Sequence, residues 1–305
     1  MVKKIGGLVP FLPVHSGTLA MNCIGPMHSL RIALAAFFVS PFCAVFAESS
    51  PSSPLGSTAF VWEELIPKVT PNGKRRDVVN RPTATLVKFQ SHITTLNPGL
   101  ASHPPHQHAL EELIFLKEGQ LDVTINGQTH AASPGSVLFY ASNDFHNVRN
   151  VGATPATYIV VNFGTAATAT APRERAADSA VPGRLRSQAF EWPAAPSRVN
   201  RTSERRDFFN APTVTCENLS CHSTTIKPGE AAHGAHRHPD EEVVIVKEGI
   251  IEAVMNGTVR RGGPGSIFFF ASNEEHGLRN VGETAATYYV LRVITAATPK
   301  VVSKN

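Results

Sequence analysis

The sequence predicts an all-β protein made of two tandem copies of one module. A gapless internal repeat runs at a constant offset of 130 residues, so that "PGSVLFYASNDFHNVRNVG" at 134–152 answers "PGSIFFFASNEEHGLRNVG" at 264–282. Apolar residues come in short β-branched or aromatic runs bounded by Gly, Pro, Asn or Ser, which is typical of strands. No run keeps the 3.6-residue period of a helix. Many short, turn-bounded strands indicate a sandwich or jelly roll.

The first 47 residues have the layout of a secretory signal rather than of a folded domain. After Met27, a plausible second start, a weakly basic segment leads into an apolar stretch from Ile32 to Phe46. This stretch is about 15 residues long, shorter than the roughly 20 that span a bilayer. We expect cleavage after Ala47 and export to the periplasm or medium, with no membrane anchor left on the mature chain.

The repeat places the first module at 57–164 and the second at 187–296, each long enough for its own core. The connecting residues 165–186 are rich in Ala, Thr and Pro, which is typical of a linker. Signal removal takes Lys3, Lys4 and Arg31 and no acidic residue, so the net charge of +4 falls to about +1. A basic footprint for nucleic acid is therefore not expected.

Two cysteines, Cys216 and Cys221, remain in the mature chain. Five residues of extended strand span roughly 16 Å, whereas a disulfide requires Cα atoms within about 7 Å. We expect two separate, buried thiols.

Each module concentrates histidines and glutamates before an apolar run: "HPPHQHALEELIFLKEG" at 103–119 and "HGAHRHPDEEVVIVKEG" at 233–249. Alternate residues of a strand share a face, so His106, His108 and Glu112 are predicted to point the same way. A later segment adds His146. The matching candidates of the second module are His236, His238, Glu242 and His276. Imidazole nitrogens with one carboxylate suit Mn, Fe, Ni, Zn or Cu, one ion per module.

These residues resemble the two motifs of the cupin family. The first motif is matched from His106 through Glu112 to Gly119, and the second, more loosely, by Gly127, Pro134, Gly135, His146 and Asn150; the second module matches likewise. The resemblance implies two double-stranded β-helix barrels, each holding a divalent metal on three histidines and a glutamate. It also implies an open coordination position for substrate, as in a catalytic site.

Several other residues recur in both modules, and each pair has an expected role. Glu111 and Glu241 become ligands only if a bulge shifts the strand register. His103 and His233 are expected at the rim of the site, and His92 and His222 as satisfied core imidazoles. Arg149 and Arg279 either bind an anion or end a strand in solvent. Arg75-Arg76-Asp77 and its copy are expected to form an ion pair between the modules, and Gly119 to adopt positive φ in a turn.

Taken with the predicted signal, the resemblance to cupins implies an exported metal-dependent enzyme of dioxygenase or decarboxylase type. Its substrate would be a small organic acid, a phenol or a sugar-derived compound, and Glu112 and Glu242 would also move protons. Oxalate decarboxylases share the two-site layout, but this chain is shorter than expected for one and has no recognisable lid motif, so that activity is kept only as an alternative. The alternatives are a module that binds a small molecule or metal without chemistry, and a purely structural metal. A homo-oligomer is left open, because the two modules can also pair with each other.

Overall fold

The computed structural model describes residues 53–171 and 181–300, which belong to one compact unit. The predicted signal, its cleavage site after Ala47 and the second start at Met27 lie outside the described residues, as do residues 172–180 of the predicted linker. Within the described ranges no helix is long and apolar enough to cross a membrane.

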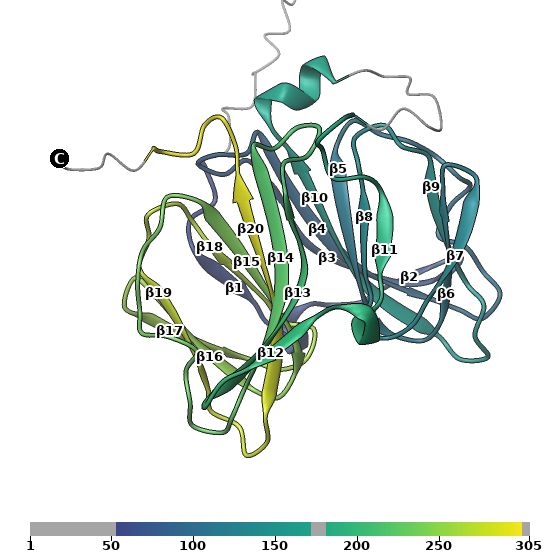
Figure 1. Cartoon of the computed structure of the whole chain (residues 1–305). Coiled ribbons are helices and arrows are strands. Elements are labelled where there is room, and N and C mark those ends of the chain that lie inside the picture. Colours follow the sequence, from purple (N-terminus) through teal and green to yellow (C-terminus); the bar gives the residue numbers. More distant parts are fainter. Residues whose placement is uncertain (1–52, 172–180, 301–305) are drawn as a thin grey trace, which may run out of the picture. The chain divides into compact units, whose positions relative to one another are not determined.

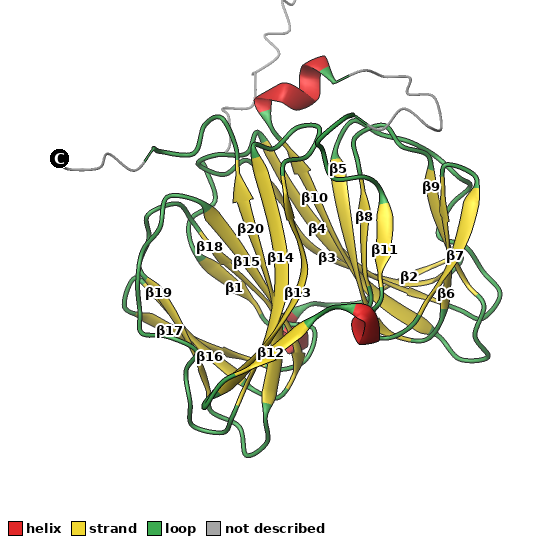
Figure 2. Cartoon of the chain, in the orientation of Figure 1, coloured by secondary structure: helices red, strands yellow, loops and turns green. Residues whose placement is uncertain are grey.

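The described chain is built of β-strands joined by turns and three short 3-10 helices, as the sequence predicts (Figure 2). The first half contains β1 (Thr58–Phe60), η1 (Trp62–Glu64), β2 (Lys68–Thr70), β3 (Gly73–Arg81), β4 (Lys88–Leu96), β5 (Glu111–Glu118), β6 (Leu121–Ile125), β7 (Gln128–Ala132), β8 (Val137–Tyr140), β9 (His146–Asn150), β10 (Ala156–Gly164) and η2 (Ala166–Thr170). The second half contains β11 (Gln188–Phe190), η3 (Trp192–Ala194), β12 (Ser197–Val199), β13 (Ser203–Ala211), β14 (Asn218–Ile226), β15 (Glu241–Glu248), β16 (Ile251–Met255), β17 (Thr258–Gly262), β18 (Ile267–Phe270), β19 (His276–Asn280) and β20 (Ala286–Ile294).

Each module pairs a seven-stranded sheet with a three-stranded sheet (Figure 1). In the first module the large sheet has the order β11-β8-β5-β10-β4-β3-β2 and faces the small sheet β7-β6-β9. In the second module the orders are β1-β18-β15-β20-β14-β13-β12 and β17-β16-β19. All pairings between these strands are antiparallel. The predicted pair of tandem jelly-roll barrels is confirmed.

The central strands of the large sheets are buried on both faces, which explains their continuous apolar sequences. On β5, Leu113 and Phe115 pack into a core shared with the second module, whereas Ile114 and Leu116 face the interior of their own barrel. Because successive side chains of a strand alternate between faces, one strand serves both layers. The same alternation sends Glu112 into the barrel and Glu111 toward the other module.

The two modules exchange their first strands. Strand β1, at the start of the first repeat, pairs with β18 of the second module, and β11 pairs with β8 of the first (Figure 1). After β1, the indole of Trp62 lies over Gly265, where an added Cβ would come within 2.3 Å of the ring. The repeat boundaries therefore do not coincide with sheet membership, because each repeat donates its first strand to the other barrel.

Glu111 and Glu241 each accept hydrogen bonds from threonines of the other module, in two equivalent sets. The Thr213 hydroxyl donates to Glu111 at 2.6 Å and the Thr215 amide at 3.2 Å, and Thr83 and Thr85 bond Glu241 at the same distances. Burial raises the pKa of both carboxyl groups. The reading of these glutamates as metal ligands is wrong, because strand alternation turns them away from the histidines.

The charged triplet near the start of each module pairs locally. Asp77 accepts from Lys68 at 2.7 Å and from Arg75 at 2.8 Å, and these hydrogen bonds lower its pKa to about 2. Arg76 donates to the Leu65 carbonyl and lies over the Trp62 ring. The predicted ion pair between modules is wrong, because all these partners lie in one repeat.

Two smaller predictions are confirmed. Cys216 and Cys221 are free and buried. Gly119 has a φ of +88°, and a Cβ there would lie 2.5 Å from Ala156, so the turn after β5 excludes other residues.

Candidate metal centre

In each module the first two candidate histidines precede the ligand strand instead of belonging to it. Strand β5 begins only at Glu111, and His106 makes an isolated bridge to His146 on β9. The two residues exchange backbone hydrogen bonds of 3.1 and 2.9 Å. This bridge, and not the expected continuous strand, holds the segment beside β9.

The histidines of each module nevertheless converge on one point. One ring nitrogen each from His106, His108 and His146 lie within 4.8 Å of one another. Glu112 joins them, with Oε2 3.3 Å from His108 Nε2 and Oε1 3.9 Å from His146 Nε2. The second module repeats the cluster with His236, His238 and His276, and there Glu242 Oε2 lies 3.3 Å from His238 Nε2. All eight predicted ligand positions are thus brought together, four in each barrel.

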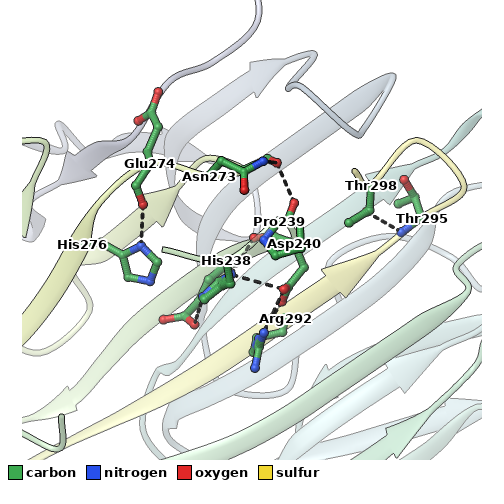
Figure 3. Close-up of polar contacts among 11 residues, drawn as sticks. His238, Pro239, Asp240, Asn273, Glu274, His276, Arg292, Thr295 and Thr298 are labelled. Carbon is green, nitrogen blue, oxygen red and sulfur yellow. Dashed lines mark hydrogen bonds and ion pairs between the residues drawn. The ribbon is translucent and has the colours of Figure 1, made fainter. Parts of the chain in front are cut away.

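The backbone fixes the orientation of the last histidine of each centre. His146 Nδ1 donates to the Asp144 carbonyl at 2.9 Å, and His276 Nδ1 donates to the Glu274 carbonyl at the same distance (Figure 3). The Nε2 atoms of both rings are buried and have no hydrogen-bond partner among the described residues. An orphaned imidazole nitrogen held beside two other imidazoles and a carboxylate fits a transition metal, whose histidine ligands are oriented through the other ring nitrogen.

Electrostatics favour the metal-binding protonation states at His106 and Glu112, whereas the carboxylate of Glu112 raises the pKa of the adjacent His108. Burial and the neighbouring His103 lower the pKa of His106 to about 4. Burial raises the pKa of Glu112, but the hydrogen bond from His108 and the charge of His146 outweigh it and leave the pKa below its usual value. Neutral imidazole and ionised carboxylate are the ligand forms of these side chains.

The first centre opens into a cavity of about 500 Å³. Besides the four candidate ligands, its wall includes Arg75, His92, Thr94, Ser102, Ile114, Tyr158, Val160 and Asn162. Asn162 lies directly opposite Glu112 in the pairing of β10 with β5. This volume accommodates a small organic molecule beside the ligand cluster.

The second centre has a charged pair where the first has neutral residues. Arg292, which replaces Asn162, donates to Asp240, with Nη2 2.8 Å from Oδ1. Figure 3 shows Asp240 between Arg292 and His238, whose Nδ1 lies 3.2 Å from Oδ1. Burial lowers the pKa of His238, but the hydrogen bonds to Asp240 and Glu242 raise it to about 9. Asp240 stands where the first module has Leu110. Sequence reasoning missed this network, although a position-by-position comparison of the repeats shows both replacements.

A ring of different chemistry stacks on the last histidine of each centre. Tyr140 stacks on His146 with ring centroids 4.4 Å apart, and Phe270 stacks on His276 at the same distance. The Tyr140 hydroxyl is buried and makes no hydrogen bond to the described residues.

Of the remaining histidine and arginine predictions, some agree with the structure and one is wrong. His103 is exposed at the rim, with its ring centroid 3.9 Å from that of His106. His92 and His222 are not satisfied core residues, because the Nδ1 atom of each is buried without a partner among the described residues and each lines a cavity. Arg149 donates to the Gly99 carbonyl and is exposed, which fits the strand-end reading.

Comparisons with known proteins agree with this architecture. A family model described as "Cupin domain" matches residues 92–162 and 222–292. No match to a curated protein was found. Among solved structures, a mutant of Bacillus subtilis oxalate decarboxylase aligns with a TM-score of 0.59 and 14% identity, covering 79% of this chain and 78% of the other. The formate complex of Lactobacillus farciminis oxalate decarboxylase gives 0.59 and 14%, covering 79% and 87%. Protein Ylba from E. coli gives 0.59 and 13%, covering 81% and 93%.

Proposed function

Because this chain is a two-domain cupin, we propose that it is a metal-dependent enzyme of decarboxylase or dioxygenase type that acts on a small organic acid. The observation that carries the proposal is the first centre, where three histidines and Glu112 meet at the wall of a 500 Å³ cavity. A divalent metal held there would act as a Lewis acid toward a carboxylate or enolate oxygen.

The charges around the cavity support an anionic substrate over a neutral phenol or sugar. A divalent ion bound beside one carboxylate, Glu112, leaves a net positive site. The guanidinium of Arg75 stands on the cavity wall, where its ion pair with Asp77 partly offsets the positive charge. Among the ligands, Glu112 is the group that can hold or move a proton, because one carboxylate oxygen stays free when the other binds a metal.

We propose manganese as the metal of first choice. The donor set accepts several metals, but Bacillus subtilis oxalate decarboxylase, whose fold this chain shares, has Mn(II) centres. Iron and zinc are the next choices, followed by nickel and copper.

The test is metal analysis of the purified mature chain, followed by turnover assays. Oxygen consumption and carbon dioxide release are measured with a panel of organic acids that includes oxalate, on Mn-loaded, Fe-loaded and chelator-treated protein. We expect release of carbon dioxide or uptake of oxygen with one acid, lost on chelation. Saturable binding of an acid without turnover would contradict the proposal and favour a binding module.

We also propose that the chain is exported and cleaved after Ala47. Mass spectrometry of protein recovered from periplasm and medium should find a chain that begins at Glu48. Recovery of an uncut chain from the cytoplasm alone would contradict this.

A further inference from the structure

The first cavity contains a buried acceptor that no described residue satisfies. Asn162 on β10 is 6% exposed, lines the cavity, and its Oδ1 has no hydrogen-bond partner among the described residues. In the strand pairing it stands directly opposite Glu112, so the two side chains are neighbours on one face. A buried acceptor costs free energy unless a ligand or water bonds to it.

A second unsatisfied atom lies one diagonal step away. His92 on β4 pairs with Val160, two residues from Asn162 on β10, and its Nδ1 is buried without a partner among the described residues. Diagonal neighbours on a sheet face lie about 7–8 Å apart, which leaves space between them for one small group. Burial and the charge of Arg75 lower the pKa of His92 to about 4, so this imidazole is neutral near pH 7.

The second module has lost this arrangement. His222 keeps its unpartnered Nδ1, but Arg292 replaces Asn162, and Asp240 holds its guanidinium. A guanidinium offers only donors, whereas the Asn162 oxygen is an acceptor. The two centres therefore differ in the polarity of the group opposite the ligand glutamate.

We infer that Asn162 and His92 recognise a hydroxyl group of the substrate in the first cavity, so that the enzyme selects hydroxy acids over simple carboxylic acids. This inference rests on the proposed function, because it names the substrate class of the same site. The substrate carboxylate would face the histidine cluster and its hydroxyl would face the opposite wall. A hydroxyl donates to Asn162 Oδ1 and can accept from or donate to His92 Nδ1, so it matches either imidazole tautomer.

The test compares two acids that differ only in a hydroxyl, 3-hydroxypropanoate and propanoate, by isothermal titration calorimetry on the Mn²⁺-loaded mature chain. The parent chain should prefer the hydroxy acid by about 3- to 10-fold, as one or two neutral hydrogen bonds provide. N162L and H92F should each bring this ratio close to one, because they weaken binding of the hydroxy acid more than binding of propanoate. H222F, the matched variant of the second module, should keep the parent ratio.

A double variant tests the same inference by gain. D240L/R292N gives the second centre the Leu and Asn that the first has at positions 110 and 162, and the number of hydroxy-acid sites per chain should rise. Circular dichroism and metal analysis establish that each variant is folded and loaded. An unchanged preference in both N162L and H92F overturns the inference and leaves the proposed function intact. Failure of both acids to bind the parent chain overturns both.

Discussion

The two metal centres agree in their ligand atoms and differ in the walls around them. Three histidines and a glutamate recur at the same offsets, with the same backbone carbonyls orienting the last histidine. Opposite the glutamate, however, the first centre has Asn162 and the second has Arg292, which is engaged by Asp240. Metal binding fixes the ligand set, whereas the wall is free to change with the task. We therefore expect the first centre to carry the reaction.

The largest expected effect is the loss of one centre at a time. H146A and H276A should each reduce bound metal from about two ions per chain to about one, because each removes a ligand from one barrel. Only H146A should reduce turnover severely, by roughly 100-fold or more, if the first centre is catalytic. Elemental analysis and steady-state rates on the same preparations check this, and equal rate losses in both variants would contradict the asymmetry.

A smaller effect is expected at the module interface, where the two halves are equivalent. E111A leaves the Thr213 hydroxyl and the Thr215 amide without their acceptor, at a cost of about 2–4 kcal/mol in the free energy of unfolding. E241A should cost the same at Thr83 and Thr85. Urea unfolding measures both, and clearly unequal costs would show that the asymmetry extends beyond the metal centres.

The interface also predicts a pH dependence. Because burial raises the pKa of Glu111 and Glu241, the folded chain binds protons more tightly than the unfolded chain there. The two protonated carboxyl groups therefore contribute to the free energy of unfolding. This contribution is fully present below the unfolded pKa of about 4.3 and is lost as pH rises through the raised pKa values of the folded chain. E111Q/E241Q should flatten this part of the stability profile. A decline of unchanged slope in the double variant would assign it to other groups.

A still smaller effect is expected on the metal affinity of the second centre. D240N removes the negative charge that offsets the Arg292 guanidinium near Glu242 and His238, and a nearby cation weakens the binding of another cation. Metal affinity of the second centre should fall by about tenfold, with the first unchanged. Competition with a chromogenic chelator resolves the two sites. L110N, at the matching position of the first module, is the control and should leave both affinities near parent values.

The smallest effect concerns the stacked rings. Y140F removes a buried hydroxyl that has no partner among the described residues and copies the Phe270 of the second module. We expect it to leave the free energy of unfolding unchanged or to raise it by up to about 1 kcal/mol. The reverse change, F270Y, should cost about 1–2 kcal/mol. A marked loss in Y140F would indicate that the hydroxyl has a partner in solution.

Much of this architecture could be predicted because the repeat and the strand period are written in the chain itself. The offset of 130 residues predicts the two modules. The alternation of side chains along a strand predicts that Glu112 faces the histidines and Glu111 does not. This alternation alone could not say that Glu111 bonds Thr213, because long-range partners leave no local pattern. The Asp240–Arg292 pair was within reach, since both residues break the repeat at once.

Strand exchange, in contrast, could not be read from the sequence. The segments "AFVW" and "AFEW" are so alike that either would fit β8 or β18. Which barrel each segment completes depends on the path of the chain between modules and not on side-chain preference. The expected role of His92 failed for a related reason, because burial of one ring nitrogen without a partner depends on the whole cavity.

The reciprocal strands β1 and β11 also bear on the ancestry of the protein. Two identical subunits that each lend an arm to the other would form a closed twofold dimer with both sets of Glu–Thr hydrogen bonds equivalent. Gene duplication and fusion of such a subunit would give this chain. Once fused, the two halves would no longer have to share one sequence. One cavity could then specialise while the interface between the modules kept its symmetry.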